Sequence, residues 1–167
     1  MCYRLLAAVL FTVLLQQGAG ASGVPAIPFV DGLWRGDIRT APGSGAFEEC
    51  WASTTFDDLT TLTLSERKDG TWQLQLSNPG WRLPQSHRYA MTALVDFYPR
   101  LRIEAETMSE TRLEFADINS IPLLRFIEIG HTIDLTSDGF NATYDLEGSA
   151  KVIERLRDCF AANARAG

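Results

Sequence analysis

Residues 143–159, Thr-Tyr-Asp-Leu-Glu-Gly-Ser-Ala-Lys-Val-Ile-Glu-Arg-Leu-Arg-Asp-Cys, constrain the fold more than any other stretch of this chain. They begin with the alternation of a strand, Gly148 permits a sharp turn, and apolar residues then recur at helical spacing up to Cys159. The pattern predicts a final helix over 149–162 that lays an apolar stripe on the rest of the fold. We interpret Ser149 as the residue that caps this helix, and not as a nucleophile.

The first 21 residues have the features of a secretory signal peptide. Arg4 supplies a positive charge, Leu5 to Leu15 form an apolar run, and Ala19-Gly20-Ala21 fits an A-x-A cleavage site. The apolar run is too short to span a bilayer, although an N-terminal membrane anchor is the alternative. We therefore expect cleavage near Ala21 and a periplasmic or secreted protein. Residues 22–32 are expected to be a flexible lead-in to a single domain over 33–163.

The charge of the chain argues against several kinds of partner. Removal of residues 1–21 takes away Arg4 and no acidic residue, so the formal net charge changes from −6 to −7. An acidic chain without a basic stripe is a poor candidate for binding nucleic acid or anionic lipid, because both need clustered Lys and Arg. No other apolar run is long enough to cross a bilayer, so we expect no stable membrane insertion after signal cleavage.

Cysteine usage predicts one disulfide. Cys2 is removed with the signal peptide, which leaves Cys50 and Cys159. Two cysteines in an exported protein usually pair, although two free buried thiols are the alternative. A bridge closing a loop of about 110 residues would stabilise the fold by a little under 5 kcal/mol on the chain-entropy model, less any native strain.

The region between the cysteines is predicted to be mostly antiparallel strands. Apolar residues alternate with Thr, Ser and Gln on both sides of Asp69-Gly70, which is a strong hairpin signal. A second hairpin is expected around Asp138-Gly139. A long strand is expected to carry one apolar face made of Tyr89, Met91, Ala93, Val95 and Phe97.

One helix is expected to interrupt the strands over 121–129, with Asn119-Ser120 as its capping signal. The predicted fold is therefore α+β and mostly β. We expect an antiparallel β-sandwich or partial barrel with one short inserted helix and a C-terminal helix packed on the sheet.

Two sets of residues carry a resemblance to a known family. The first set is Cys50, the following hairpin, Trp72-Gln-Leu-Gln-Leu, Pro79-Gly80-Trp81-Arg-Leu and Tyr89…Val95-Asp96; the second is Tyr144-Asp-Leu-Glu-Gly148-Ser149-Ala150…Leu156…Cys159. This succession resembles the invasion-associated locus B-like exported proteins of proteobacteria. The resemblance implies a small β-rich protein of the periplasm or cell surface, with no catalytic residues to carry over. The chain departs from the pattern because it lacks an additional cysteine pair in the middle of the domain.

The sequence contains no recognisable catalytic or cofactor motif. Neither His87 nor His131 has a second potential metal ligand at helical or hairpin spacing, so no structural metal site is predicted. A loosely bound calcium ion is the alternative. No serine lies in Gly-x-Ser-x-Gly, and no Gly-rich phosphate loop is present. We therefore predict a protein that is not an enzyme and holds no cofactor.

Aromatic residues are the remaining candidates for a binding surface. Trp72 is expected in the core because it alternates with leucines, whereas Trp81 follows a Pro-Gly turn and is expected to be partly exposed. We expect the working surface among the loops around Trp81, His87 and Tyr98.

Three hypotheses follow for the function. The first is a monomeric, non-enzymatic module that binds a protein or an envelope component. The second is a periplasmic inhibitor or immunity-like protein that uses its acidic surface against a basic hydrolase. The third is an enzyme in which folding brings Asp96, His87 and an arginine together. The alternative for Asp96 is a residue that ends a strand and either bonds the backbone of the turn or pairs with an arginine.

Overall fold

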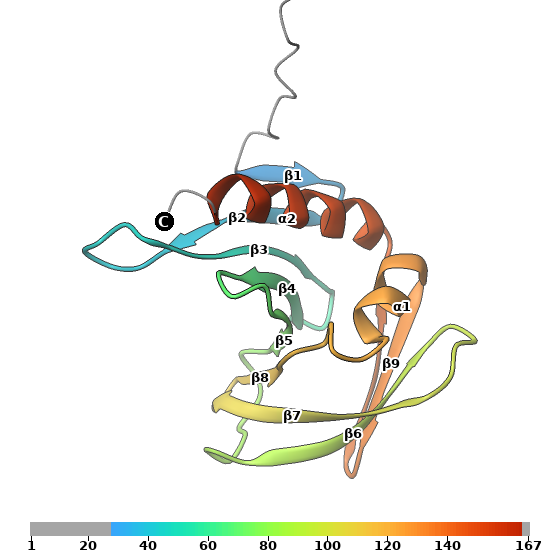
Figure 1. Ribbon diagram of the computed structural model, residues 1–167. Coiled ribbons are helices and arrows are strands. Elements are labelled where there is room, and N and C mark those ends of the chain that lie inside the picture. The colour runs from blue at the N-terminus through green and yellow to red at the C-terminus, as the bar shows by residue number, and fades with distance from the viewer. Residues whose placement is uncertain (1–27, 165–167) are drawn as a thin grey trace, which may run out of the picture.

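The computed structural model describes residues 28–164, which form one ten-stranded antiparallel sheet and two helices (Figure 1). The predicted signal peptide and its cleavage site lie outside the described residues. The elements in chain order are β1 (Phe29–Asp31), β2 (Trp34–Thr40), β3 (Phe47–Thr55), β4 (Thr61–Arg67), β5 (Trp72–Ser77), β6 (Arg88–Val95), β7 (Leu101–Ser109), β8 (Arg112–Phe115), α1 (Leu123–Ile129), β9 (Thr132–Ser137), β10 (Phe140–Asp145) and α2 (Ser149–Asn163). Their order across the sheet is β1-β2-β3-β4-β5-β8-β7-β6-β9-β10.

Both predicted Asp-Gly hairpins are confirmed. The strands β4 and β5 pair around Asp69-Gly70, and β9 and β10 pair around Asp138-Gly139. Gly70 and Gly139 each have a φ of +80°, a left-handed conformation that glycine adopts without a steric penalty.

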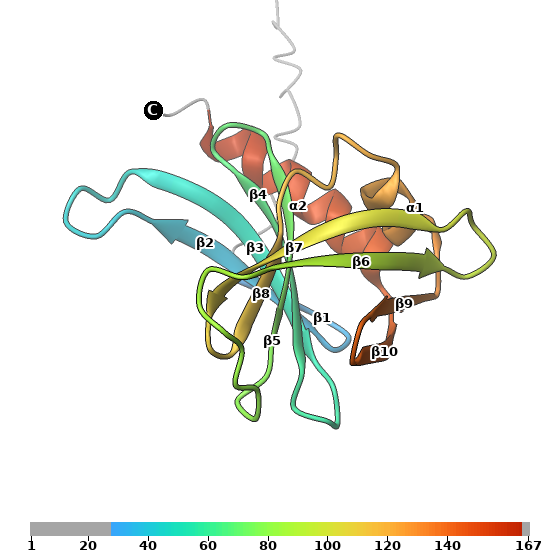
Figure 2. The ribbon, with the colours of Figure 1, turned by 90° about the horizontal axis from the view of Figure 1, so that it is seen from below.

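The sheet curves strongly and encloses an apolar core on its inner face without closing into a barrel (Figures 1 and 2). Leu62 and Leu64 of β4 face inward with their register partners Leu76 and Leu74 of β5, and all four side chains are buried. The predicted class, mostly β with a C-terminal helix packed on the sheet, is confirmed.

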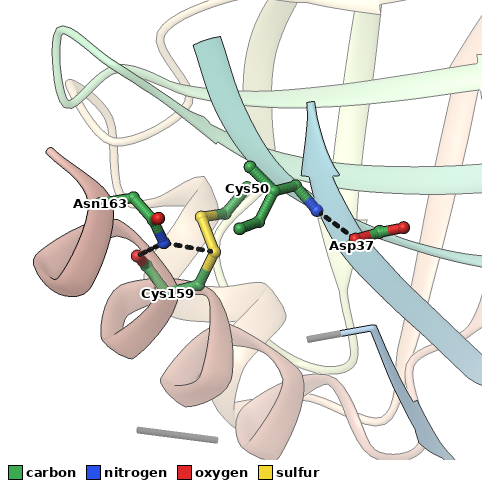
Figure 3. The surroundings of a disulfide bond; sticks show 5 residues. Asp37, Cys50, Cys159 and Asn163 are labelled. Atoms are coloured by element: carbon green, nitrogen blue, oxygen red, sulfur yellow. Dashed lines mark hydrogen bonds between the residues drawn. A yellow bond between two sulfur atoms is a disulfide. The ribbon is translucent and has the colours of Figure 1, made fainter. Parts of the chain in front are cut away.

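The helix α2 packs across β3 and β4 through its apolar stripe, in which Val152, Ile153 and Leu156 are buried. Cys159 on the same side of the helix forms a disulfide with Cys50 of β3, with 6.2 Å between the two Cα atoms (Figure 3). Both cysteines are buried, so the covalent link joins the last helix to the sheet within the core.

The sheet begins earlier than the sequence predicts. Phe29–Asp31, assigned above to a flexible lead-in, pairs with β2 as strand β1. The Phe29 ring fills the space beside Gly36, where an added Cβ would lie 2.2 Å from the ring. Asp31 forms ion pairs with Lys151 at 2.7 Å and with Arg155 at 3.2 Å. These contacts with distant residues hold a strand that is too short to show alternation.

The predicted helix caps are wrong at both helices. The N-cap of α2 is Gly148 in a left-handed conformation, and the Ser149 hydroxyl instead donates to the Ile127 carbonyl at 2.7 Å. Before α1, the Asn119 side chain accepts a hydrogen bond from the Trp72 backbone N–H at 3.0 Å. In both cases the polar side chain bonds the backbone of another element and does not cap its own helix.

The long strand β6 also ends earlier than predicted. Asp96 has a φ of +43°, which breaks the alternation after Val95. Phe97, expected on the buried face, is therefore fully exposed.

Candidate functional site

A cavity of about 320 Å³ lies between the loop after β5 and the β9–β10 hairpin. Aromatic residues from three segments line it: Trp81, Tyr89 and Phe140. Apolar side chains of Leu83, Met91 and Leu113 add to this lining, and Arg82 and Asp138 contribute opposite charges. A volume of this size is at the lower end of the range for small-ligand pockets.

Local turns position the aromatic walls. The Asn78 side-chain oxygen accepts the Gly80 N–H at 2.8 Å, and the Trp81 N–H donates to the Asn78 carbonyl at 3.1 Å. The Asn78 amide also donates to the Asp58 carbonyl at 2.9 Å, which ties this turn to the preceding loop. The Trp81 ring then meets Phe140 edge-to-face, with 5.9 Å between ring centroids. The cavity is therefore formed before any ligand binds.

Arg82 is held beside the cavity by the main chain. Its guanidinium donates to the Trp81 carbonyl at 2.6 Å and to the Pro79 carbonyl at 3.2 Å. Within residues 28–164 it has no ion-pair partner, so its charge is available to an acidic group of a ligand.

The three residues of the predicted binding surface separate into two places. Trp81 lines the cavity, and His87 contacts the cavity residue Tyr89 edge-to-face at 4.5 Å. Tyr98 lies beyond the other end of β6, where it stacks on Phe126 of α1 at 4.7 Å. At about 3.3 Å per residue, the six steps of β6 from Tyr89 to Val95 span about 20 Å and separate the two places along the strand.

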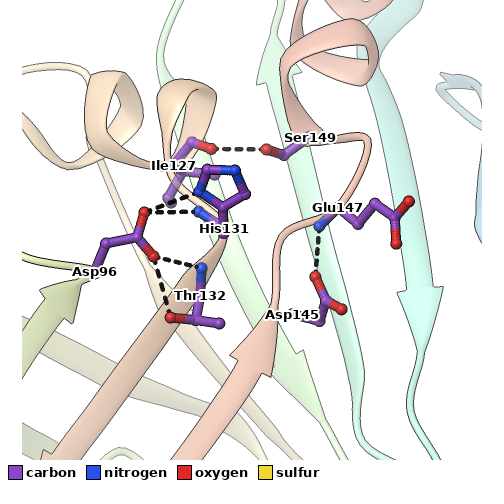
Figure 4. A network of polar contacts seen from close by, with 7 residues as sticks. All are labelled: Asp96, Ile127, His131, Thr132, Asp145, Glu147 and Ser149. Atoms are coloured by element: carbon purple, nitrogen blue, oxygen red, sulfur yellow. Dashed lines mark hydrogen bonds and ion pairs between the residues drawn. The ribbon is translucent and has the colours of Figure 1, made fainter.

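The predicted convergence of Asp96 and His87 in one site is wrong. Asp96 and His87 lie at opposite ends of β6, and the histidine beside Asp96 is His131 (Figure 4). The Asp96 carboxylate accepts the backbone N–H groups of His131 and Thr132, each at 2.9 Å, and it also contacts both of these side chains.

These contacts define the chemical state of Asp96. The Thr132 and His131 backbone N–H groups lower its pKa to about 2. Both carboxylate oxygens accept hydrogen bonds from the residues at the start of β9. Asp96 therefore ends its strand, as the alternative interpretation predicted, but its carboxylate bonds the backbone at the start of β9 and neither its own turn nor an arginine.

Sequence reasoning missed the buried carboxyl group of Glu66. Glu66 continues the inward row of β4, where its register partners are Cys50 and Trp72, and its side chain is buried beneath α2. Burial raises its pKa to about 7, against the opposing effects of the Trp72 indole and the Arg157 charge. The signal was present in the sequence, because Glu66 occupies the inward position after Leu62 and Leu64.

Comparisons with known proteins show a relationship of fold alone. No protein-family model matches the chain, and no curated protein matches its sequence. The crystal structure of invasion associated protein B from Bartonella henselae is similar, with a TM-score of 0.55 and 17% sequence identity over 78% of this chain and 95% of that chain. This match agrees with the predicted resemblance at the level of the fold.

Residues 28–164 lack two kinds of feature. No three His, Cys, Asp or Glu side chains gather there in a way that could hold a metal ion. No helix in this part of the chain is long and apolar enough to cross a membrane.

Proposed function

We propose that this protein is an exported, non-enzymatic binding module whose cavity between Trp81, Tyr89 and Phe140 receives an apolar or aromatic group of a protein or envelope partner. The observation that carries the proposal is the preformed aromatic cavity with a positive and a negative side chain beside it. Export is supported by the predicted signal peptide, and the disulfide between Cys50 and Cys159 suits an oxidising compartment.

The cavity can contribute affinity in two ways. Burying one aromatic or aliphatic side chain in it would supply roughly 1.5–3 kcal/mol. Arg82 would add a charge-assisted hydrogen bond to a carboxylate of the partner, because its guanidinium is already oriented by two carbonyls. Such a site favours a partner segment that presents an apolar side chain next to an acidic group.

A pull-down from a periplasmic extract tests the proposal with two matched variants. Trp81→Ala removes a cavity wall, whereas Trp51→Ala removes a half-buried tryptophan that does not line the cavity. We expect the wild type and Trp51→Ala to retain the same partner and Trp81→Ala to bind it at least tenfold more weakly. Equal retention by both variants, with circular dichroism showing both folded, would exclude the cavity as the binding site.

A basic hydrolase is a second candidate partner, because exposed acidic residues lie near the cavity. Glu106 and Glu110 are exposed toward the end of β7, and the Glu110 carbonyl accepts the N–H of the cavity residue Leu83 at 2.8 Å. An inhibitor of this kind should lose potency steeply as salt is added. A panel of cationic hydrolases, including toxins encoded nearby, that shows no salt-sensitive inhibition would refute this hypothesis.

A further inference from the structure

Arg82 and Asp138 are side chains of opposite charge that line the aromatic cavity without pairing with each other. The Trp81 ring meets Phe140, so the loop that carries Arg82 and the hairpin turn that carries Asp138 lie side by side at this cavity. No ion pair within 4.0 Å joins the two side chains, and within residues 28–164 neither of them pairs with another charged group. Both charges are therefore available to a single ligand.

The hydrogen bonds of Arg82 leave the useful side of its guanidinium group open. The bonds to the Trp81 and Pro79 carbonyls both come from Nη1. The N–H groups of Nε and Nη2 make no hydrogen bond within the part of the chain that the structure describes. These two nitrogens form a fork that matches the two oxygens of a carboxylate. Arg82 is therefore oriented to bind a carboxylate at this cavity.

The remaining walls suit one apolar side chain. Trp81, Tyr89 and Phe140 supply aromatic surface, and Leu83 and Met91 add aliphatic surface. A cavity of about 320 Å³ is small for a ligand pocket, so it favours a ligand smaller than a typical drug molecule. A small molecule that carries an apolar side chain, a carboxylate and an ammonium group would match the aromatic walls, the arginine and the aspartate together.

The charged residues that flank the cavity do not favour one sign. Arg88, which precedes the cavity residue Tyr89, is paired with Glu106 at 3.5 Å. Glu110 and Arg112 are exposed at the β7–β8 turn and carry opposite charges. Because these neighbours balance each other, the surroundings favour a ligand that carries both charges over one that carries a single charge.

We propose that the cavity binds a small zwitterion with an apolar side chain, which is an α-amino acid either free or within a dipeptide. The carboxylate of the ligand accepts hydrogen bonds from Arg82, its ammonium group donates to Asp138, and its side chain lies among the aromatic rings. This inference rests on the proposed function, because it takes the same cavity as the binding site, and it names the kind of molecule that carries the apolar group.

Calorimetric titration of the oxidised mature chain with L-phenylalanine and three analogues tests the proposal. L-phenylalaninamide lacks the carboxylate, N-acetyl-L-phenylalanine lacks the ammonium group, and glycine lacks the side chain. We expect phenylalanine to bind with a Kd below about 1 mM and each analogue to bind about tenfold more weakly. Phenylalanyl-alanine distinguishes the two sources, since tighter binding than phenylalanine assigns the site to a dipeptide and weaker binding assigns it to the free amino acid.

Two variants connect each charge of the protein to one group of the ligand. Arg82→Gln should weaken the binding of phenylalanine about tenfold and leave phenylalaninamide unaffected. Asp138→Asn keeps the shape of the turn residue; it should weaken phenylalanine about tenfold and leave N-acetyl-phenylalanine unaffected. Arg102→Gln removes an exposed charge from β7, does not alter the cavity lining, and should bind as the wild type does. Circular dichroism should show all three variants folded.

Absence of binding by both phenylalanine and the dipeptide at millimolar concentration would overturn the zwitterion proposal, and so would equal affinities for phenylalanine and its two blocked analogues. If either result occurs while Trp81→Ala loses its partner in the pull-down, the proposed function stands and only the zwitterion is wrong. If phenylalanine binds as expected while Trp81→Ala retains the partner fully, the zwitterion site is supported and the partner of the proposed function does not use this cavity.

Discussion

Glu66→Gln should make the protein more stable at alkaline pH. The Glu66 side chain is buried between β4 and α2, and one of its carboxylate oxygens has no hydrogen-bond partner among the described residues. Burial penalises the charged form and raises the pKa from 4.5 to about 7. Glutamine keeps the shape and a hydrogen-bonding carbonyl while removing the ionisation.

The sign and size of the effect follow from this pKa. Between pH 4.5 and 7 the folded protein holds a proton on Glu66 that the unfolded chain has released, so the free energy of unfolding falls as the pH rises through this window. The difference in pKa corresponds to at most about 3 kcal/mol. Because the group retains some solvent contact and faces Arg157, screening reduces this to roughly 1–2 kcal/mol. Glu66→Gln should therefore gain that amount above pH 7 and little near pH 5.

Urea unfolding at pH 5 and pH 8, followed by tryptophan fluorescence, measures the effect. Glu104→Gln removes the same charge from an exposed position on β7 and serves as the control. If Glu66→Gln and Glu104→Gln have the same pH dependence as the wild type, then Glu66 is ionised in the folded protein and the argument from burial is wrong.

Two further substitutions test the packing of the helices. Cys159→Ser should lower the free energy of unfolding by roughly 3–5 kcal/mol and make α2 sensitive to protease under oxidising conditions, and unchanged stability would contradict the bridge to Cys50. Gly130→Ala should cost about 1–3 kcal/mol in thermal unfolding, because its Cβ would overlap a Val95 methyl, and a neutral result would mean that α1 shifts freely.

Much of the fold was predictable because its signals are local. Alternation around Asp69-Gly70 and Asp138-Gly139 determines two hairpins through the left-handed conformation that each glycine allows. The helical spacing before Cys159 determines α2 and its buried face. In each case the residues that specify the element lie within one turn or one strand of each other.

The candidate site depended on contacts between distant segments. Trp81 was predicted to be partly exposed, but its cavity exists because the sheet curves and brings Phe140 of β10 against it. Asp96 was grouped with His87, whereas the register of β6 and β9 places it beside His131. Pattern along the chain cannot supply such pairings, because they depend on which strand ends meet after the sheet has formed.

The amino-acid sequence by itself determined the mostly β class, both Asp-Gly turns and the amphipathic last helix, since these follow from the conformational preferences and apolar spacing of neighbouring residues. Only the tertiary structure decided which apolar side chains remain exposed to solvent and which ionisable side chains are buried with a desolvation penalty. Phe97 faces solvent because Asp96 is bonded to the start of β9, and Glu66 is buried because α2 is laid over it. Both outcomes depend on elements that are distant in sequence and adjacent only in the folded protein.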